Sequence, residues 1–136
     1  MTEQVTRYLN VVEMIIINEE LIGKQSQLRD VDLLEAAVLR PQSSAFGADA
    51  YPTLIDKAAA LFHSLSRNHA FVDGNKRTST VALILFLQMN DYKLMWDPAE
   101  ALEKILAIAT GAHTIEDITT WLSANVQPAE GRPAGD

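Results

Sequence analysis

Residues 74–89 of the chain read GNKRTSTVALILFLQM, and this stretch decides the fold. From Val81 to Leu87 every side chain is apolar, so a helix over this stretch has almost no polar face. The apolar run is far shorter than the ~20 residues that a membrane-spanning helix needs. In a soluble protein such a helix must be covered by other elements, and we predict that it lies buried at the centre of the fold.

Capping signals on both sides of this stretch predict the other helices. Asn10 with Glu13 is a capping box, and it predicts a helix that runs to Gly23. The remaining signals are Asp30 or Asp32 before a helix that Pro41 stops, Pro52 as the first position of a helix to about Asn68, Asp97 before a helix closed by Gly111, and Thr114 before the last helix. No segment alternates over strand length, so the predicted fold class is all-α, a single compact six-helix bundle.

The 136 residues fit one domain, and a hydrophobic content of 48% is enough to form its core. We assign residues 1–126 to this domain. Residues 42–50 combine Ser, Gly and Asp without periodicity and are predicted to form a loop. Residues 127–136, QPAEGRPAGD, are small, polar and interrupted by proline, so they are predicted to be a flexible C-terminal tail.

The charge and the missing residue types exclude several classes of function. Eleven Lys and Arg against eighteen Asp and Glu give a net charge of −7, which opposes direct binding to nucleic acid. Cysteine is absent, so there is no disulfide, no thiolate metal site and no cysteine nucleophile. The start of the chain lacks the basic and small-residue features of a signal peptide. We therefore expect a cytoplasmic protein without a membrane partner.

Residues 69–78, HAFVDGNKRT, combine the groups that phosphate chemistry needs at the start of the buried helix. The free amides of residues 74–77 point outward there, and the helix macrodipole favours anions. Lys76 adds the compact charge of an ammonium group, and Arg77 adds a guanidinium group that can donate two parallel hydrogen bonds. Together they suit a polyphosphate. Asp73 is a candidate ligand for a magnesium ion on the same phosphates, and His69 is a candidate general base for an attacking hydroxyl. The set predicts group transfer from a nucleotide.

Simpler interpretations of these residues stand beside that prediction. Asp73 is a good N-cap, Gly74 is a common turn residue, and His69 alone would be a capping or core-edge histidine. Arg67 and Asn68 end the preceding predicted helix, where a basic residue complements the dipole, but they also adjoin His69 and could contact a nucleotide. We weigh those two interpretations of Arg67 and Asn68 equally.

The motif resembles the signature of the Fic/Doc family, H-x-F-x-[DN/E]-[GA]-N-[GK]-R, and every fixed position is filled. The pieces EELIG, LRDVDLLEAAVLRPQ and AAALFHSLSRNHAF also resemble Doc-type (death-on-curing) chains, so the resemblance covers roughly residues 8–125. It implies a six-helix bundle of the Fic/Doc type, with ATP as the donor and Mg²⁺ as the metal ion. The implied roles are His69 as general base, Asp73 on magnesium, the Gly74 amide with Asn75, Lys76 and Arg77 on phosphates, and Phe71 as a buried anchor.

The residue at position 76 bears on which phosphate is transferred. Family members that transfer AMP usually have Gly there, whereas Doc-type members have Lys and transfer the terminal phosphate, so the resemblance favours transfer of the γ-phosphate of ATP. A Doc-type toxin has Ala where this chain has Gly74, a residue that AMP-transferring members also use. Adenylylation therefore remains an alternative.

The resemblance also implies partners. A Doc-type toxin of a toxin-antitoxin system would phosphorylate a protein Ser/Thr hydroxyl, the expected acceptor being a threonine of elongation factor Tu, and so would block translation. A cognate antitoxin would neutralise it by docking a segment that is disordered when free. A further alternative is a non-catalytic helical module that only binds a partner, against which the presence of both His69 and Asp73 argues.

Overall fold

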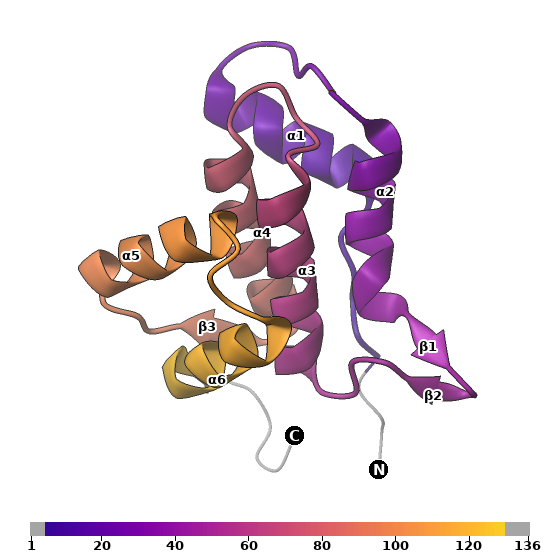
Figure 1. The fold of residues 1–136 in the computed structure, drawn as a ribbon, viewed down its shortest axis with the longest axis vertical. Coiled ribbons are helices and arrows are strands. Elements are labelled where there is room, and N and C mark those ends of the chain that lie inside the picture. The colour runs from indigo at the N-terminus through magenta and orange to yellow at the C-terminus, as the bar shows by residue number, and fades with distance from the viewer. Residues whose placement is uncertain (1–4, 130–136) are drawn as a thin grey trace.

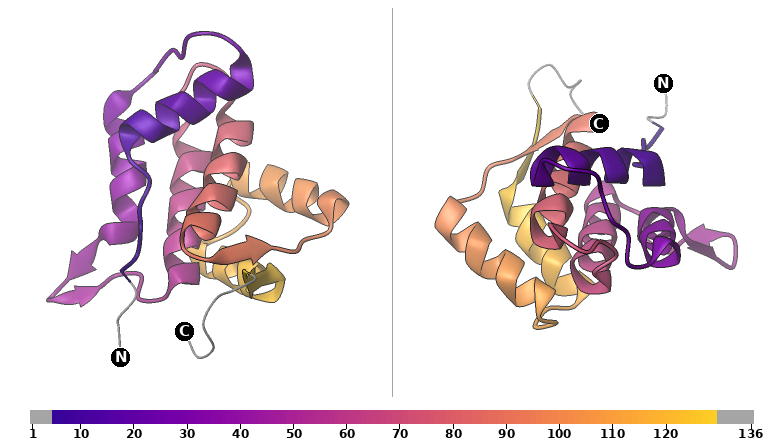
Figure 2. Two further views of the ribbon diagram at one scale, coloured as in Figure 1. Left: turned by 180° about the vertical axis from the view of Figure 1, so that it is seen from behind. Right: turned by 90° about the horizontal axis from the view of Figure 1, so that it is seen from above.

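The computed structural model describes residues 5–129 and confirms the all-α class. Its helices are α1 (Val11–Ile22), α2 (Val31–Leu39), α3 (Leu54–Asn68), α4 (Asn75–Met89), α5 (Pro98–Ala109) and α6 (Ile115–Asn125), with a 3₁₀ turn, η1 (Arg40–Gln42), after α2. Helices α3 and α4 run side by side through the middle, with α1 and α2 on one side and α5 and α6 on the other (Figures 1 and 2).

Most of the predicted caps are confirmed, and one is wrong. The capping box of Asn10 is present, and Asp30, not Asp32, caps α2. Helix α3 starts at Leu54 rather than at Pro52, because the Thr53 hydroxyl accepts a hydrogen bond from the amide of Asp56 at 3.0 Å. Thr53 and Asp56 form a capping box, which satisfies two backbone amides, whereas a helix beginning at Pro52 would have Tyr51, a poor capping residue, as its N-cap.

The centre of the bundle is shared by two helices. Helix α4 packs against α1, α3 and α5, but it is not enclosed on every side, since Leu85 remains 37% exposed. Helix α3 is the more deeply buried, because α2, α4, α5 and α6 all pack on it and the small residues Ala58, Ala59 and Ala60 let them approach closely. The largest fully buried side chains are Phe62, Phe86, Met14, Leu34, Leu61, Leu83 and Leu87.

Short strands occur in two places where the sequence predicted none. The predicted loop 42–50 contains a hairpin of β1 (Ser44–Ala45) and β2 (Ala48–Asp49), whose tip residues Phe46 and Gly47 are left-handed, with φ of 54° and 80°. Strands this short cannot show an alternating pattern, so only their pairing reveals them.

A second strand pair lies at the end of the described chain. Strand β3 (Tyr92–Leu94) pairs antiparallel with β4 (Val126–Pro128), and Lys93 faces Gln127. Two residues of the predicted tail, Gln127 and Pro128, therefore belong to a strand. Residues 130–136 of that tail lie outside the described residues.

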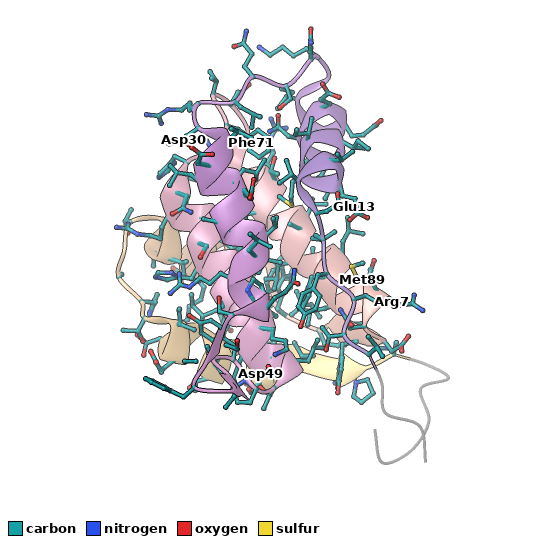
Figure 3. The ribbon with its side chains drawn as sticks, turned by 90° about the vertical axis from the view of Figure 1, so that its right-hand side faces the viewer. Arg7, Glu13, Asp30, Asp49, Phe71 and Met89 are labelled. Atoms are coloured by element: carbon teal, nitrogen blue, oxygen red, sulfur yellow. The ribbon has the colours of Figure 1, made fainter. Side chains whose placement is uncertain are left out.

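The motif and the β1–β2 hairpin occupy opposite ends of the molecule. Figure 3 shows Asp30 and Phe71 close together at one end and Asp49, at the end of the hairpin, near the other. The motif follows α3 and the hairpin precedes it, so the length of α3 separates them. Across residues 5–129, none of the helices is both long and apolar enough to span a membrane.

Candidate functional site

The predicted site residues surround one cavity at the α3–α4 junction. The cavity has a volume of about 420 Å³. It is lined by His69, Asp73, Gly74, Asn75, Lys76 and Arg77. His69 ends α3 in the left-handed conformation, with φ of 49°, and is exposed. The structure thus brings together all six residues that the sequence selected.

The backbone between α3 and α4 is held in place by the segment before α2. The amide of Arg29 donates to the carbonyl of Ala70 at 2.7 Å, and the amide of Val72 donates to the carbonyl of Gln27 at 2.9 Å. Between these bonds Phe71 pairs with Leu28, and the Phe71 side chain is 2% exposed. The buried anchor implied by the family resemblance is therefore present, and it fixes the loop that carries His69 and Asp73.

Asn75 uses its side chain to hold this loop. Its Oδ1 accepts from the Phe71 amide at 3.0 Å, and its Nδ2 donates to the Phe71 carbonyl at 2.8 Å. Both polar atoms of the side chain are thus bonded to the backbone of the loop. What Asn75 offers to a phosphate is its backbone amide, which belongs to the first turn of α4. The expected phosphate contact by this residue is therefore limited to the main chain.

Gly74 caps α4 without a side chain. Its φ of 79° is left-handed, and no side chain accepts a hydrogen bond at this helix start. The capping interpretation of Asp73 is therefore wrong, and its exposed carboxylate makes no hydrogen bond or ion pair with residues 5–129. The turn interpretation of Gly74 is right, and it is compatible with a role in phosphate binding, because the amides of the first turn stay without helical partners.

The two cations of the motif differ in their surroundings. Arg77 donates from Nη1 to the carbonyl of Leu21 at 3.3 Å, at the C-terminal end of α1. Lys76 is exposed, and its ammonium group has no ion-pair or hydrogen-bond partner among the described residues. Lys76 is consequently the cation that a phosphate can recruit without breaking an existing bond.

Arg67 and Asn68 turn away from the cavity. Arg67 donates to the carbonyl of Ala109 at 3.1 Å, at the end of α5, and Asn68 donates to the carbonyl of Leu33 at 3.3 Å, in α2. Neither residue lines the cavity. Of the two interpretations of this pair, the structure supports a structural one, although Arg67 serves the end of a neighbouring helix rather than its own.

Asn18 is a residue of the site region that the sequence analysis missed. It is fully buried in α1 and donates from Nδ2 to the Asp73 carbonyl at 2.9 Å and to Thr78 Oγ1 at 3.0 Å. Its Oδ1 accepts from Ser26 Oγ at 2.7 Å. The available signal was its position four residues after Met14, which places a polar side chain in the buried stripe of the helix.

A single carboxylate is compatible with magnesium at this cavity. The described residues contain no cluster of three or more His, Asp or Glu side chains that could hold a metal ion by themselves. Mg²⁺ does not require such a cluster, because it keeps several waters and commonly binds one or two carboxylates together with substrate phosphates. Asp73, free and next to the amides of the helix start, fits that role.

Gly74 and Gly23 provide a test of how tightly the site is packed. A Cβ on Gly74 would lie 2.8 Å from Ile22 Cγ2 and 3.2 Å from Asn18 Nδ2, whereas a Cβ on Gly23, with a similar φ of 73°, would meet nothing within 4 Å. Gly23→Ala should cost about 1–2 kcal/mol through its left-handed backbone alone. Gly74→Ala should lower the free energy of unfolding further, measured by urea denaturation. Equal losses in the two variants would contradict the close packing of α1 on Gly74.

Comparison with known proteins agrees with this site. A model of the Fic/DOC family matches residues 8–87, more than half of the chain, and includes the whole motif. The chain is also similar to Toxin Doc of Mycolicibacterium smegmatis, with 49% identity over 92 residues that cover 68% of this chain and 71% of that protein. The chain therefore belongs to the Fic/Doc family and is of the Doc type.

Proposed function

We propose that this protein is a Doc-type toxin that transfers the γ-phosphate of ATP to a Ser or Thr hydroxyl of another protein. The observation that carries the proposal is the cavity itself, where a histidine, an unpaired carboxylate and the free amides of a helix start converge. The name of the relative in Mycolicibacterium smegmatis supports the toxin part of the proposal. Fic/Doc proteins are transferases, which supports the reaction class.

The proposed reaction assigns a task to each residue. His69 accepts the proton of the acceptor hydroxyl, whose oxygen forms a bond to the γ-phosphorus while the bond to the β-phosphate oxygen breaks and ADP leaves. The amides of residues 74–77 and the Lys76 ammonium hold the phosphates, with Arg77 adding charge at the edge. Asp73 would hold a magnesium ion, which would supply positive charge to the phosphates.

Lys76 is the residue to which we assign the choice of phosphate. It stands in the first turn of α4. In one nucleotide pose its side chain would compete for the space of a bound phosphate. A nucleotide bound in the opposite orientation avoids this competition and presents its γ-phosphate, instead of its α-phosphate, to the acceptor hydroxyl. Adenylylation is the second candidate, and what favours it is the presence at position 74 of glycine, the residue that AMP-transferring members of the family also use there.

The partners in the proposal are proteins. The expected acceptor is a translation factor such as elongation factor Tu in the cytoplasm, and the expected inhibitor is a cognate antitoxin. Direct binding to nucleic acid is not part of the proposal, because the net charge of −7 opposes approach to a polyanion everywhere except at the local phosphate site.

One experiment separates the candidates. The purified protein is incubated with elongation factor Tu, magnesium and ATP labelled at either the α or the γ phosphate, and the modified protein is analysed for label and added mass. Label from the γ position supports phosphorylation, and label from the α position supports adenylylation. Label from neither, with the fold intact, would count against elongation factor Tu as the acceptor and would favour the binding-module alternative.

His69→Ala should lower transfer by about 10²- to 10⁴-fold, the usual effect of losing a general base. The exposed position of His69 predicts little change in stability. His113→Ala is the matched control, since His113 lies outside the cavity, and it should retain wild-type activity. Rates are compared under single-turnover conditions; a His69 variant as active as the control would remove the residue from its assigned role.

Asp73→Asn should lower the affinity for magnesium and abolish most of the activity. It should cause no measurable loss of stability, because Asp73 does not cap α4. Asp97→Asn is the control: Asp97 does cap α5, and Asn caps a helix about as well. The magnesium dependence of transfer is measured for both. An unchanged dependence in Asp73→Asn would contradict its assignment as the metal ligand.

Lys76→Gly should lower γ-phosphate transfer and allow measurable AMP transfer, because it opens the space that the side chain fills. Lys76→Met keeps most of that volume without the charge, so it should lose γ-transfer without gaining α-transfer. The two labelled ATPs measure both activities. If wild type already delivers the α label, Lys76 does not select the phosphate, and adenylylation replaces the first candidate.

A further inference from the structure

We propose that Asn18 is a positioning residue that locks the Asp73–Gly74 peptide so that the Gly74 N–H faces the cavity. The inference deepens the proposed function and rests on it, because it assigns the orientation of one phosphate-binding amide to a residue that does not touch the nucleotide. Asn18 lies in α1, more than fifty residues before the amide that it controls.

The lock is a buried and fully bonded side chain. The Asp73 carbonyl can only accept hydrogen bonds, so the Asn18 atom that faces it at 2.9 Å must be the donor Nδ2. The side-chain oxygen of Asn18, Oδ1, accepts a hydrogen bond from the Ser26 hydroxyl. The backbone amide of Ser26 in turn donates to Glu19 Oε2 at 2.9 Å. Because Asn18 is completely buried, no water competes for these bonds.

The geometry of the peptide bond transfers this constraint to Gly74. The peptide is trans, so its C=O and N–H groups point in opposite directions. With the Asp73 carbonyl directed at Asn18, the Gly74 N–H is directed away from the buried network, and it has no hydrogen-bond partner within residues 5–129. Gly74 also lines the cavity, so this free N–H is aimed where a phosphate would bind.

A lock is needed here because the local sequence does not supply one. Glycine adopts many backbone conformations at similar energy, and no side chain caps α4. Rotation of this one peptide would replace the inward N–H by a carbonyl, which repels phosphate. Breaking the bond to Asn18 would leave a buried donor unsatisfied, and that penalty opposes the rotation.

The test compares Asn18→Leu with Thr78→Val. Both variants remove the Asn18–Thr78 hydrogen bond, but only Asn18→Leu also removes the bonds to the Asp73 carbonyl and to the Ser26 hydroxyl. Two measurements are made: the binding of inorganic tripolyphosphate with magnesium by calorimetry, and the NMR signal of the Gly74 amide with its distance from the Asp73 α-proton. We expect Asn18→Leu to weaken tripolyphosphate binding about 10- to 100-fold and to change that distance, whereas Thr78→Val changes the affinity less than about twofold.

Each outcome decides a different statement. Equal affinity losses in the two variants, with an unchanged Gly74 signal, would show that Asn18 is only structural and would overturn the inference. If the wild-type protein binds no tripolyphosphate, the proposed function fails, while the distance in the free variants still tests the lock. If Asn18→Leu fails to fold even with sucrose added as a stabiliser, the wild-type protein is tested instead. We expect tripolyphosphate to shift the NMR signal of its Gly74 amide. A shift confined to the amides of Lys76 and Arg77 would overturn the inference.

Discussion

The left-handed backbone of Gly74 is the constraint on which the cavity depends. Because this residue has no Cβ, α1 approaches so closely that an added carbon would lie 2.8 Å from Ile22 Cγ2. That approach brings Asn18 within reach of the Asp73 carbonyl and the end of α1 within reach of Arg77. The conformation of Gly74 thus determines both how closely α1 packs on α4 and how the groups that line the cavity are oriented.

The features predicted correctly from the sequence are local ones. The capping box at Asn10 and the caps at Asp97 and Thr114 depend on residues three positions apart, so the chain shows them directly. The motif was found for the same reason, since its ten residues are contiguous. Pro52 and Thr53 are neighbouring start signals, and the capping box of Thr53 with Asp56 sets the start of α3 one residue after Thr53.

The features that the sequence did not reveal depend on contacts between distant residues. The strand pair of Tyr92–Leu94 with Val126–Pro128 has no pattern in either strand alone. The use of the Asn75 side chain on the Phe71 backbone and the place of Asn18 beside Asp73 become visible only when the helices are packed. The greater burial of α3 likewise results from the four α-helices that pack on it, and the hydrophobicity of its own sequence does not reveal them.

The pairing of β3 with β4 limits how the region between these strands, residues 95–125, can vary. It brings the end of α6 back beside the end of α4, so residues 95–125 form an excursion that leaves and returns at nearly the same place. The family model, which matches residues 8–87, ends before this excursion begins. The two ends of the excursion are held together by the strand pair. Within this excursion the buried faces of α5 and α6 stay tied to α3, on which both helices pack, so only its exposed positions can change without repacking the core.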